Sequence, residues 1–177
     1  MKLCFTGHRP NSLPFGYNET DKRCIELKDI IYKLIEKSII ELNVNHFISG
    51  MALGIDMICA EIVLELKHKY PHILLECAIP SKDQYIKWQE SHKKRYKEIL
   101  HKADKITLIQ ENYSASCMML RNKYMISQAD YVIAIYTDNI KSGTYKTIQE
   151  AEKSGKEIFI INPYNLYFDE NALYEGF

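Results

Sequence analysis

The 177-residue chain is 46% hydrophobic and 26% charged, and its 23 Lys and Arg residues balance its 23 Asp and Glu residues. A net charge of zero argues against a broad nucleic-acid or acidic-membrane surface, although it leaves room for a local basic pocket. Five scattered cysteines without a C-x-x-C pair, and no apolar run approaching a signal peptide or a membrane span, lead us to expect a reduced, cytoplasmic protein.

Short apolar runs alternate with helical patterns along the chain. The apolar runs predict six strands, over residues 2–6, 46–49, 73–79, 106–109, 131–136 and 157–161. Apolar residues at helical spacing predict the helices between them, over 22–42, 56–69, a segment after 81 that includes the charged run 90–102, 117–128 and 143–155. No two strands are joined by a hairpin-length turn. This pattern predicts an α/β fold, with a mostly parallel open sheet and helices on both faces.

Prolines and one capping residue set the expected boundaries in the first part of the chain. The prolines at positions 10 and 14 are expected to keep residues 10–20 extended and non-helical. Asp21 follows this segment and is the predicted N-cap of the first helix, because its carboxylate can accept from the unpaired N–H groups of the first turn. The first helix is therefore expected to begin directly after Asp21.

The third strand is expected to end at Pro80, and Ser81 is the predicted cap of a helix that contains Trp88. The tail over residues 164–177 is aromatic and acidic, and it lies outside the motif-bearing part, residues 2–163. No linker or repeat interrupts the pattern. We therefore expect one domain over residues 1–177.

The segment from Ser49 to Asp56 joins a short strand to a helix and contains two glycines, Gly50 and Gly54. Glycine lets a backbone approach a ligand closely, and a helix N-terminus offers unpaired N–H groups with partial positive charge. The spacing matches neither the dinucleotide fingerprint nor a P-loop. The segment is either a phosphate-binding turn or a tight strand–helix connection.

Four turns follow the carboxyl ends of predicted strands, over residues 6–9, 49–56, 80–81 and 138–144. In parallel sheets of this kind a ligand lies beyond the carboxyl ends of the strands, near the point where the strand order reverses. Glycine and hydroxyl residues recur at three of these turns. Together they predict a site for a phosphate-bearing ligand.

Three side chains in these turns have two interpretations each. Arg9 can pair bidentately with a phosphate, or it is a surface arginine beside a proline turn. His8 can be a structural hydrogen-bond donor or a general acid. Asp56 is either a carboxylate favoured by the helix dipole or an acceptor for a ribose hydroxyl. Each pair of interpretations stays open from the sequence.

Arg121 and Asn122 lie in a predicted helix whose methionines are expected to be core residues. An arginine in such a segment needs a partner, and a phosphate is a natural one. Ser142, Gly143 and Thr144 offer N–H groups and hydroxyls at the start of another helix, where the simpler interpretation is a plain cap.

Several of these segments together resemble one family. Residues 4–10 (C-F-T-G-H-R-P), 49–56 (S-G-M-A-L-G-I-D), 121–125 (R-N-K-Y-M) and 143–144 (G-T) are similar to the YpsA-like branch of the SLOG superfamily. That superfamily is Rossmann-like and includes the DprA/Smf proteins and the LOG phosphoribohydrolases. The resemblance extends from Cys4 to about Pro163 and implies a single-domain, Rossmann-like fold.

The resemblance implies a protein that binds a nucleotide or a nucleotide-derived signal, such as a linear or cyclic ADP-ribose-like molecule, and senses or sequesters it. It further implies a homo-oligomer. We expect no metal and no cofactor, and the zero net charge and the lack of a long apolar run lead us to expect neither a nucleic-acid nor a membrane partner. The ligand-binding residues expected on this basis are Thr6, Gly7, His8, Arg9, Ser49, Gly50, Met51, Gly54, Asp56, Pro80, Arg121, Asn122, Ser142, Gly143, Thr144 and Thr147.

Two related activities give alternative functions. LOG enzymes are nucleotide N-glycosidases that use the glutamate of a P-G-G-x-G-T-x-x-E motif, and Thr147 occupies that position here. A hydroxyl cannot replace a carboxylate in activating water or stabilising an oxocarbenium-like transition state. We therefore expect a binding protein rather than an enzyme, with Glu150, Asp56 or Glu61 as the working carboxylate if it is an enzyme. A lesser alternative is a DprA-like single-stranded DNA binder, for which the sequence shows no Lys/Arg-rich groove.

Overall fold

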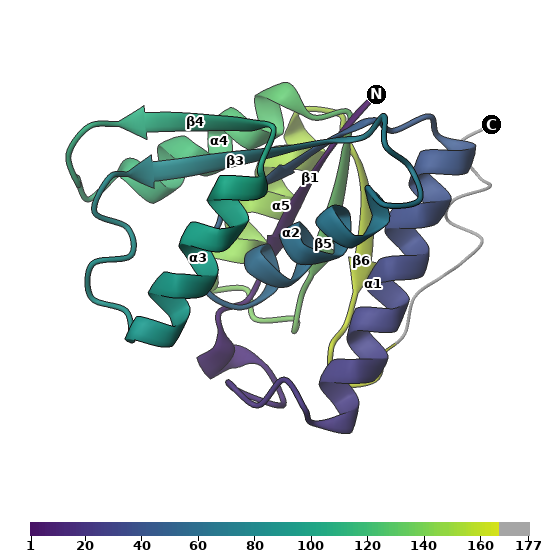
Figure 1. The fold of residues 1–177 in the computed structure, drawn as a ribbon, viewed down its shortest axis with the longest axis horizontal. Helices are drawn as coiled ribbons and strands as arrows, with labels where there is room; N and C mark the ends of the chain where they lie inside the picture. Colours follow the sequence, from purple (N-terminus) through teal and green to yellow (C-terminus); the bar gives the residue numbers. More distant parts are fainter. Residues whose placement is uncertain (167–177) are drawn as a thin grey trace.

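The computed structural model describes residues 1–166, which form one six-stranded parallel sheet with helices on both faces (Figure 1). The strands are β1 (Lys2–Gly7), β2 (His46–Ser49), β3 (Leu74–Ser81), β4 (Lys105–Gln110), β5 (Tyr131–Ile135) and β6 (Glu157–Ile161). They lie in the order β4-β3-β2-β1-β5-β6, and every neighbouring pair is parallel. The open, parallel α/β fold predicted from the sequence is confirmed. Most of the predicted tail, residues 167–177, lies outside the described residues.

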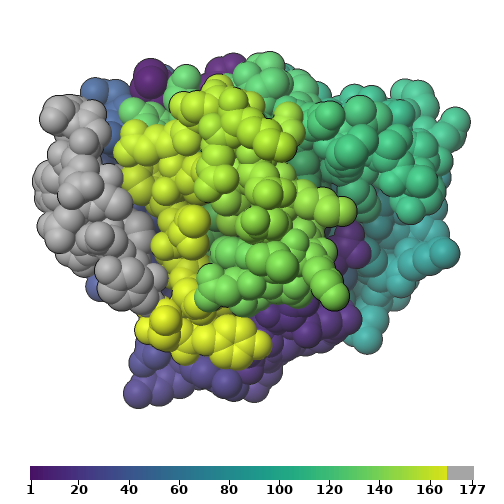
Figure 2. Space-filling model, turned by 180° about the vertical axis from the view of Figure 1, so that it is seen from behind, coloured from purple at the N-terminus to yellow at the C-terminus, as the bar shows by residue number. Residues whose placement is uncertain are grey.

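The helices divide into two layers. They are the short 3₁₀ helix η1 (Pro10–Ser12), α1 (Lys22–Glu41), α2 (Ile55–Leu66), α3 (Glu90–Lys102), α4 (Cys117–Gln128) and α5 (Gly143–Lys153). α1, α2 and α3 pack side by side on one face of the sheet, and α4 and α5 pack together on the other, which Figure 2 shows from behind. Each layer encloses apolar side chains against the sheet. Within residues 1–166 no helix combines the length and apolar character needed to cross a membrane.

The start of α1 follows the sequence closely. The Asp21 carboxylate accepts from the N–H of Arg23 at 2.9 Å and so caps the helix as predicted. Leu27, Ile31 and Leu34 recur at helical spacing and are buried against α2 and the sheet. The apolar stripe thus fixes which face of this 20-residue helix turns inward.

The strand order reverses at β1. From β1 the chain proceeds outward through β2, β3 and β4, and it then returns to the other side of β1 to form β5 and β6. β1 and β5 are hydrogen-bonded neighbours, with Gly7 opposite Ile135 at their carboxyl ends. Their outgoing segments lead to helices on opposite faces of the sheet, which leaves a crevice between them.

Two expected boundaries were wrong. β3 continues through Pro80 to Ser81, and Ser81 is not a helix cap, because α3 begins at Glu90 after Gln89. β2 ends opposite Cys77, so beyond that point β3 has a hydrogen-bonded neighbour on one side and tolerates a proline. Trp88 therefore lies in the turns before α3. Its ring packs edge-on against that of Tyr96, with 5.4 Å between the ring centroids.

The segment over residues 10–20, expected to be wholly non-helical, begins with the 3₁₀ turn η1. Pro10 occupies its first position, where a fixed φ suits helical geometry and a missing N–H costs nothing. The prolines therefore direct this segment into a short helical turn before the chain reaches α1.

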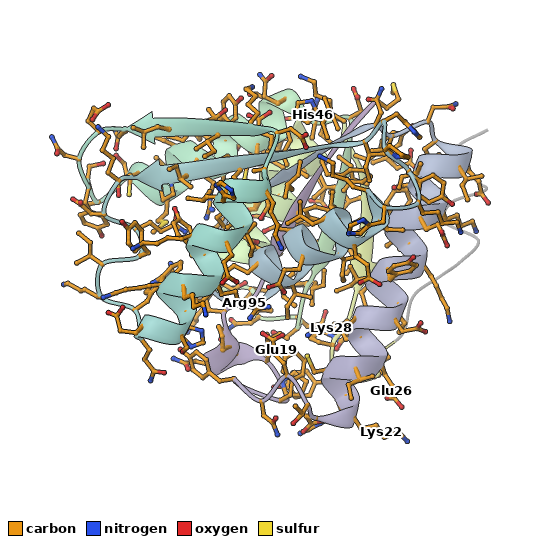
Figure 3. All side chains as sticks on the ribbon, viewed as in Figure 1. Glu19, Lys22, Glu26, Lys28, His46 and Arg95 are labelled. Atoms are coloured by element: carbon orange, nitrogen blue, oxygen red, sulfur yellow. The ribbon has the colours of Figure 1, made fainter. Side chains whose placement is uncertain are left out.

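A buried carboxylate ties three strands to α4 on the second face. Glu76 in β3 is 1% exposed, and its oxygens bond to Nε2 of His46 and accept from the hydroxyls of Thr107 and Tyr124, each at 2.7 Å. Lys105 Nζ lies 3.1 Å away. Burial raises the pKa of Glu76, but the hydrogen bonds outweigh burial and hold that pKa at about 2. His46 is the first residue of the interior strand β2 and lies well apart from Arg95 (Figure 3).

We expect Glu76→Gln to lower the free energy of unfolding at neutral pH by about 1.5–3 kcal/mol, because the charged acceptor of several hydrogen bonds is lost. Since the folded pKa is below the unfolded value of about 4.3, the wild-type advantage is complete above that pH and disappears as the pH falls through about 2. Urea unfolding followed by circular dichroism at pH 7 and pH 3 measures both effects. Glu111→Gln, at an exposed carboxylate paired with Lys82, is the control, and an equal loss in both variants would contradict the assignment.

Candidate functional site

A cleft of about 410 Å³ lies beyond the carboxyl ends of β1 and β5, at the point where the strand order reverses. The loop after β1, the start of α2, one face of α4 and the start of α5 form its walls. The predicted residues that line it are Thr6, Gly7, His8, Arg9, Asp56, Arg121, Asn122, Ser142, Gly143 and Thr144. Residues from four separate segments of the sequence thus meet in one place.

Other predicted residues lie outside the cleft lining, namely Ser49, Gly50, Met51, Gly54, Pro80 and Thr147. Five lining residues were missed from the sequence: Phe5, Ser12, Ala52, Met118 and Asn139. Ser12, at the end of η1, and Asn139 are polar residues in the segments that follow β1 and β5, so their position after a strand end was an available signal. Met118 is half-buried and lines the cleft, whereas the sequence predicted it in the core because its neighbours in the sequence are apolar.

The glycines of the 49–56 turn serve internal packing rather than close approach to a ligand. A Cβ on Gly50 would overlap the guanidinium of Arg121 and lie 2.7 Å from Oδ2 of Asp56. Gly54 has a φ of +94°, and a Cβ there would lie 2.8 Å from the carbonyl oxygen of His8. A Cβ on Gly7 would lie 2.5 Å from that of Ile55. These glycines allow the turns after β1 and β2 to pack against each other.

Arg121 and Asp56 form a buried ion pair at the base of the cleft. They are 5% and 6% exposed, and Nη1 of Arg121 lies 3.5 Å from Oδ2 of Asp56. The same Nη1 donates to the carbonyl of Gly50, and the N–H of Ala52 donates to Asp56 at 3.2 Å. Burial raises the pKa of Asp56, and the charge of Arg121 opposes that rise. The pair joins α4 to the turn between β2 and α2.

Two nitrogens of the Arg121 guanidinium are committed within the protein. Nε donates to Oδ1 of Asn122 at 2.8 Å, and Nη1 donates to Gly50. Nη2 makes no hydrogen bond to the described residues, although Arg121 lines the cleft. The guanidinium therefore has a fixed orientation and one uncommitted donor nitrogen.

The start of α5 provides further donors. Ser142 is the N-cap, as its plainer interpretation predicted, and its hydroxyl accepts from the N–H of Tyr145 at 3.1 Å. The N–H groups of Gly143 and Thr144 precede the first intrahelical bond and have no partner in the helix. A Cβ on Gly143 would meet nothing within 4 Å, so this helix start is open to the cleft. Unpaired N–H groups at a helix N-terminus attract anions.

Thr147, at the position of the LOG glutamate, connects α5 to α4. Its hydroxyl donates to the carbonyl of Gly143 at 3.0 Å and accepts from Nδ2 of Asn122 at 2.8 Å. Because the Asn122 amide nitrogen is used in this way, its oxygen faces Nε of Arg121. Thr147 thus orients Arg121 through Asn122.

His8 is 4% exposed and lies against the start of the loop after β5. Its Nε2 accepts from the N–H of Thr137 at 3.1 Å and lies 2.9 Å from the Thr137 hydroxyl. A backbone N–H can only donate, so Nε2 carries no proton and Nδ1 does. Burial lowers the pKa of His8, which favours the same neutral form. The geometry therefore makes His8 a neutral ring whose Nε2 is an acceptor and whose proton is on Nδ1.

The carboxylates considered for catalysis lie in different places. Glu61 pairs with Arg95 at 2.7 and 2.6 Å, in an ion cluster with Glu19 and Lys28 between the helices of the first face (Figure 3). Glu150 faces a separate groove between α4 and α5. Among the described residues Asp56 is the one carboxylate lining the cleft, and no three His, Cys, Asp or Glu side chains gather there or elsewhere as metal ligands.

Comparison with known proteins gives one family. The family model described as the YspA SLOG family matches residues 3–166. The SPbeta prophage-derived protein YoqJ of Bacillus subtilis strain 168 is 34% identical over 153 residues, which cover 78% of this chain and 89% of that protein. A UPF0398 protein of Brevibacillus brevis is 28% identical over 93% of this chain and 90% of its own length. A UPF0398 protein of Halalkalibacterium halodurans is 29% identical over 73% and 71%.

We expect Gly50→Ala to lower the free energy of unfolding by about 1–3 kcal/mol, because the added methyl group must displace the buried Arg121 guanidinium. Gly143→Ala is the matched control, since the space around its Cβ is open. Urea unfolding of both variants measures the difference. Equal stabilities for the two variants would show that Gly50 is not packed against Arg121.

A second prediction concerns the tautomer of His8. Long-range ¹H–¹⁵N spectra should show the proton on Nδ1 at pH 7, and the ring should titrate below the usual 6.5. Since the unfolded chain then takes up the proton first, the contribution of His8 to stability is complete above about pH 6.5 and is lost as the pH falls through the folded pKa. Thr137→Val, which keeps the backbone N–H, should retain the tautomer. A proton on Nε2 in the wild type would contradict this assignment.

Proposed function

This chain belongs to the YspA SLOG family, and we propose that its cleft binds the phosphate-bearing part of a nucleotide or nucleotide-derived molecule, such as a linear or cyclic ADP-ribose-like compound. The protein would sense or sequester this ligand. The observation that carries the proposal is the uncommitted Nη2 of the buried Arg121, in the same cleft as the open N-terminus of α5. A guanidinium held in place by its other nitrogens is preorganised for a phosphate oxygen.

The charge of the cleft also favours an anion. Arg9 at the rim and Arg121 at the base each contribute one positive charge, and Asp56 offsets one of them. The charge of Arg9 acts on both members of the buried pair: it opposes the rise that burial causes in the pKa of Asp56, and it adds to the fall that burial causes in the pKa of Arg121. His8 is neutral, and its Nε2 accepts from the N–H of Thr137. A cleft with one net positive charge and several N–H donors suits a phosphate group.

Binding without cleavage is favoured by two residues near Arg121. Oδ2 of Asp56 contacts Arg121 and accepts from the N–H of Ala52, so this carboxylate is held against a buried guanidinium. Thr147 presents a hydroxyl, which cannot activate water at a glycosidic carbon as a carboxylate does. We therefore propose that a bound nucleotide leaves the protein unchanged.

The test is incubation with nucleoside monophosphates, NAD and ADP-ribose, followed by removal of free ligand, release by heat and chromatography. Recovery of unaltered ligand in a stoichiometric amount supports the proposal. Recovery of free base would instead establish an N-glycosidase. Absence of any retained compound from the whole panel would contradict nucleotide binding.

We expect Arg9→Ala to weaken binding of the retained nucleotide by at least tenfold, because a charge-assisted contact worth about 1.5–3 kcal/mol is lost. Arg9 is exposed and caps no helix by its side chain, so the variant should fold normally. Arg23→Ala, at an exposed arginine that pairs with Asp21 away from the cleft, is the control. Titration calorimetry at fixed salt measures both, and equal affinities for the two variants would remove Arg9 from the site.

A further inference from the structure

A second hollow of about 400 Å³ lies beside the cleft, between α4 and α5 on the face seen in Figure 2. The two hollows share Met118, Asn122 and Gly143 as lining residues. The cleft and this α4–α5 groove therefore adjoin each other at the start of α5. Neither the cleft contacts nor the family assignment gives the groove a role.

The walls of the groove are largely apolar. Met118 is half-buried, Met119 is 52% exposed, and Ile126 closes the inner end at 2% exposure. The polar atoms of Asn122 and Thr147 are bonded to each other, so they do not add an unsatisfied polar group to the wall. Thioether side chains are polarizable and adapt to the flat faces and edges of aromatic rings. The groove thus offers an apolar surface for a planar ring, with Lys123 and Lys146 among its other lining residues.

The rim of the groove carries one carboxylate with no partner. Glu150 of α5 is half-buried, and its carboxylate makes neither a hydrogen bond nor an ion pair within residues 1–166. A carboxylate is an acceptor and has no proton to donate at neutral pH. It would bond to an amino group that enters the groove, and Lys146 beside it supplies a cation at the same rim.

We propose that the α4–α5 groove receives the nucleobase of the ligand, with the ring between the methionines and an exocyclic amino group bonded to Glu150. This inference rests on the proposed function, since the phosphate at the start of α5 directs the rest of the ligand toward the groove. The expected ligand is a nucleotide whose base carries an amino group, as in adenine compounds. Base and phosphate are then recognised by neighbouring parts of the same pair of helices.

The experiment compares three probes by titration calorimetry: ribose 5-phosphate, AMP and IMP. The wild type should bind AMP at least tenfold more tightly than ribose 5-phosphate, and more tightly than IMP, which has an oxygen where AMP has an amino group. Met119→Asp should reduce the affinity for AMP to near that for ribose 5-phosphate and leave the latter unchanged. Glu150→Gln should reduce the preference for AMP over IMP.

Matched variants separate these effects from general damage. Ile40→Asp places the same charge on an exposed apolar position of α1, and Glu152→Gln changes an exposed carboxylate of α5 outside the groove; both should bind AMP like the wild type. Equal wild-type affinities for AMP and ribose 5-phosphate would overturn the base site and leave the phosphate cleft standing. No binding of any probe would overturn both. A change from dimer to monomer in Met119→Asp by light scattering, with AMP affinity unaltered, would assign the groove to a second copy of the chain and overturn the inference.

Discussion

The buried pair of Arg121 and Asp56 is the interaction on which the site depends. Burying two charges is costly unless they are paired and their remaining groups are hydrogen-bonded, and here Gly50, Ala52 and Asn122 complete the set. Leaving one member unpaired would cost about 3–5 kcal/mol, so α4 and the turn between β2 and α2 are held at one separation. The contacts that hold these elements together therefore also fix the orientation of Nη2, the uncommitted nitrogen of Arg121.

This arrangement is how a chain without net charge could hold the anion that we propose for the cleft. Most of the proposed donors are not free side-chain charges: they are N–H groups at the start of α5 and a histidine held neutral by the N–H of Thr137. Such donors need no counter-ion and keep their orientation in the empty site, so little reorganisation accompanies binding. These donors are held in place by the packing of the backbone. Gly7, Gly50 and Gly54 contribute to that packing, because they let the turns after β1 and β2 contact each other.

The sequence predicted the fold well because its signals are local and repeated. The Asp21 cap, the helical spacing of apolar residues and the apolar runs each depend on near neighbours. The boundary errors at Pro80, Ser81 and Trp88 arose because the extent of β3 depends on where β2 ends, which is a long-range property. In the site, the segments were found from their positions after strands. The packing of Gly50 against Arg121 joins residues about 70 positions apart in the sequence. The exposure of Met118 to the cleft depends on how α4 is rotated about its axis. No local sequence pattern encodes either feature.

Thr147 shows how one substitution in a helix changes what the surrounding site is suited to do. A glutamate at this position would place an acceptor near the start of α5, whereas threonine both donates to the Gly143 carbonyl and accepts from Asn122. The hydroxyl therefore bonds to two neighbouring polar groups, and it fixes the amide that orients Arg121. Through Asn122, Thr147 helps to hold the guanidinium that we propose binds the anion.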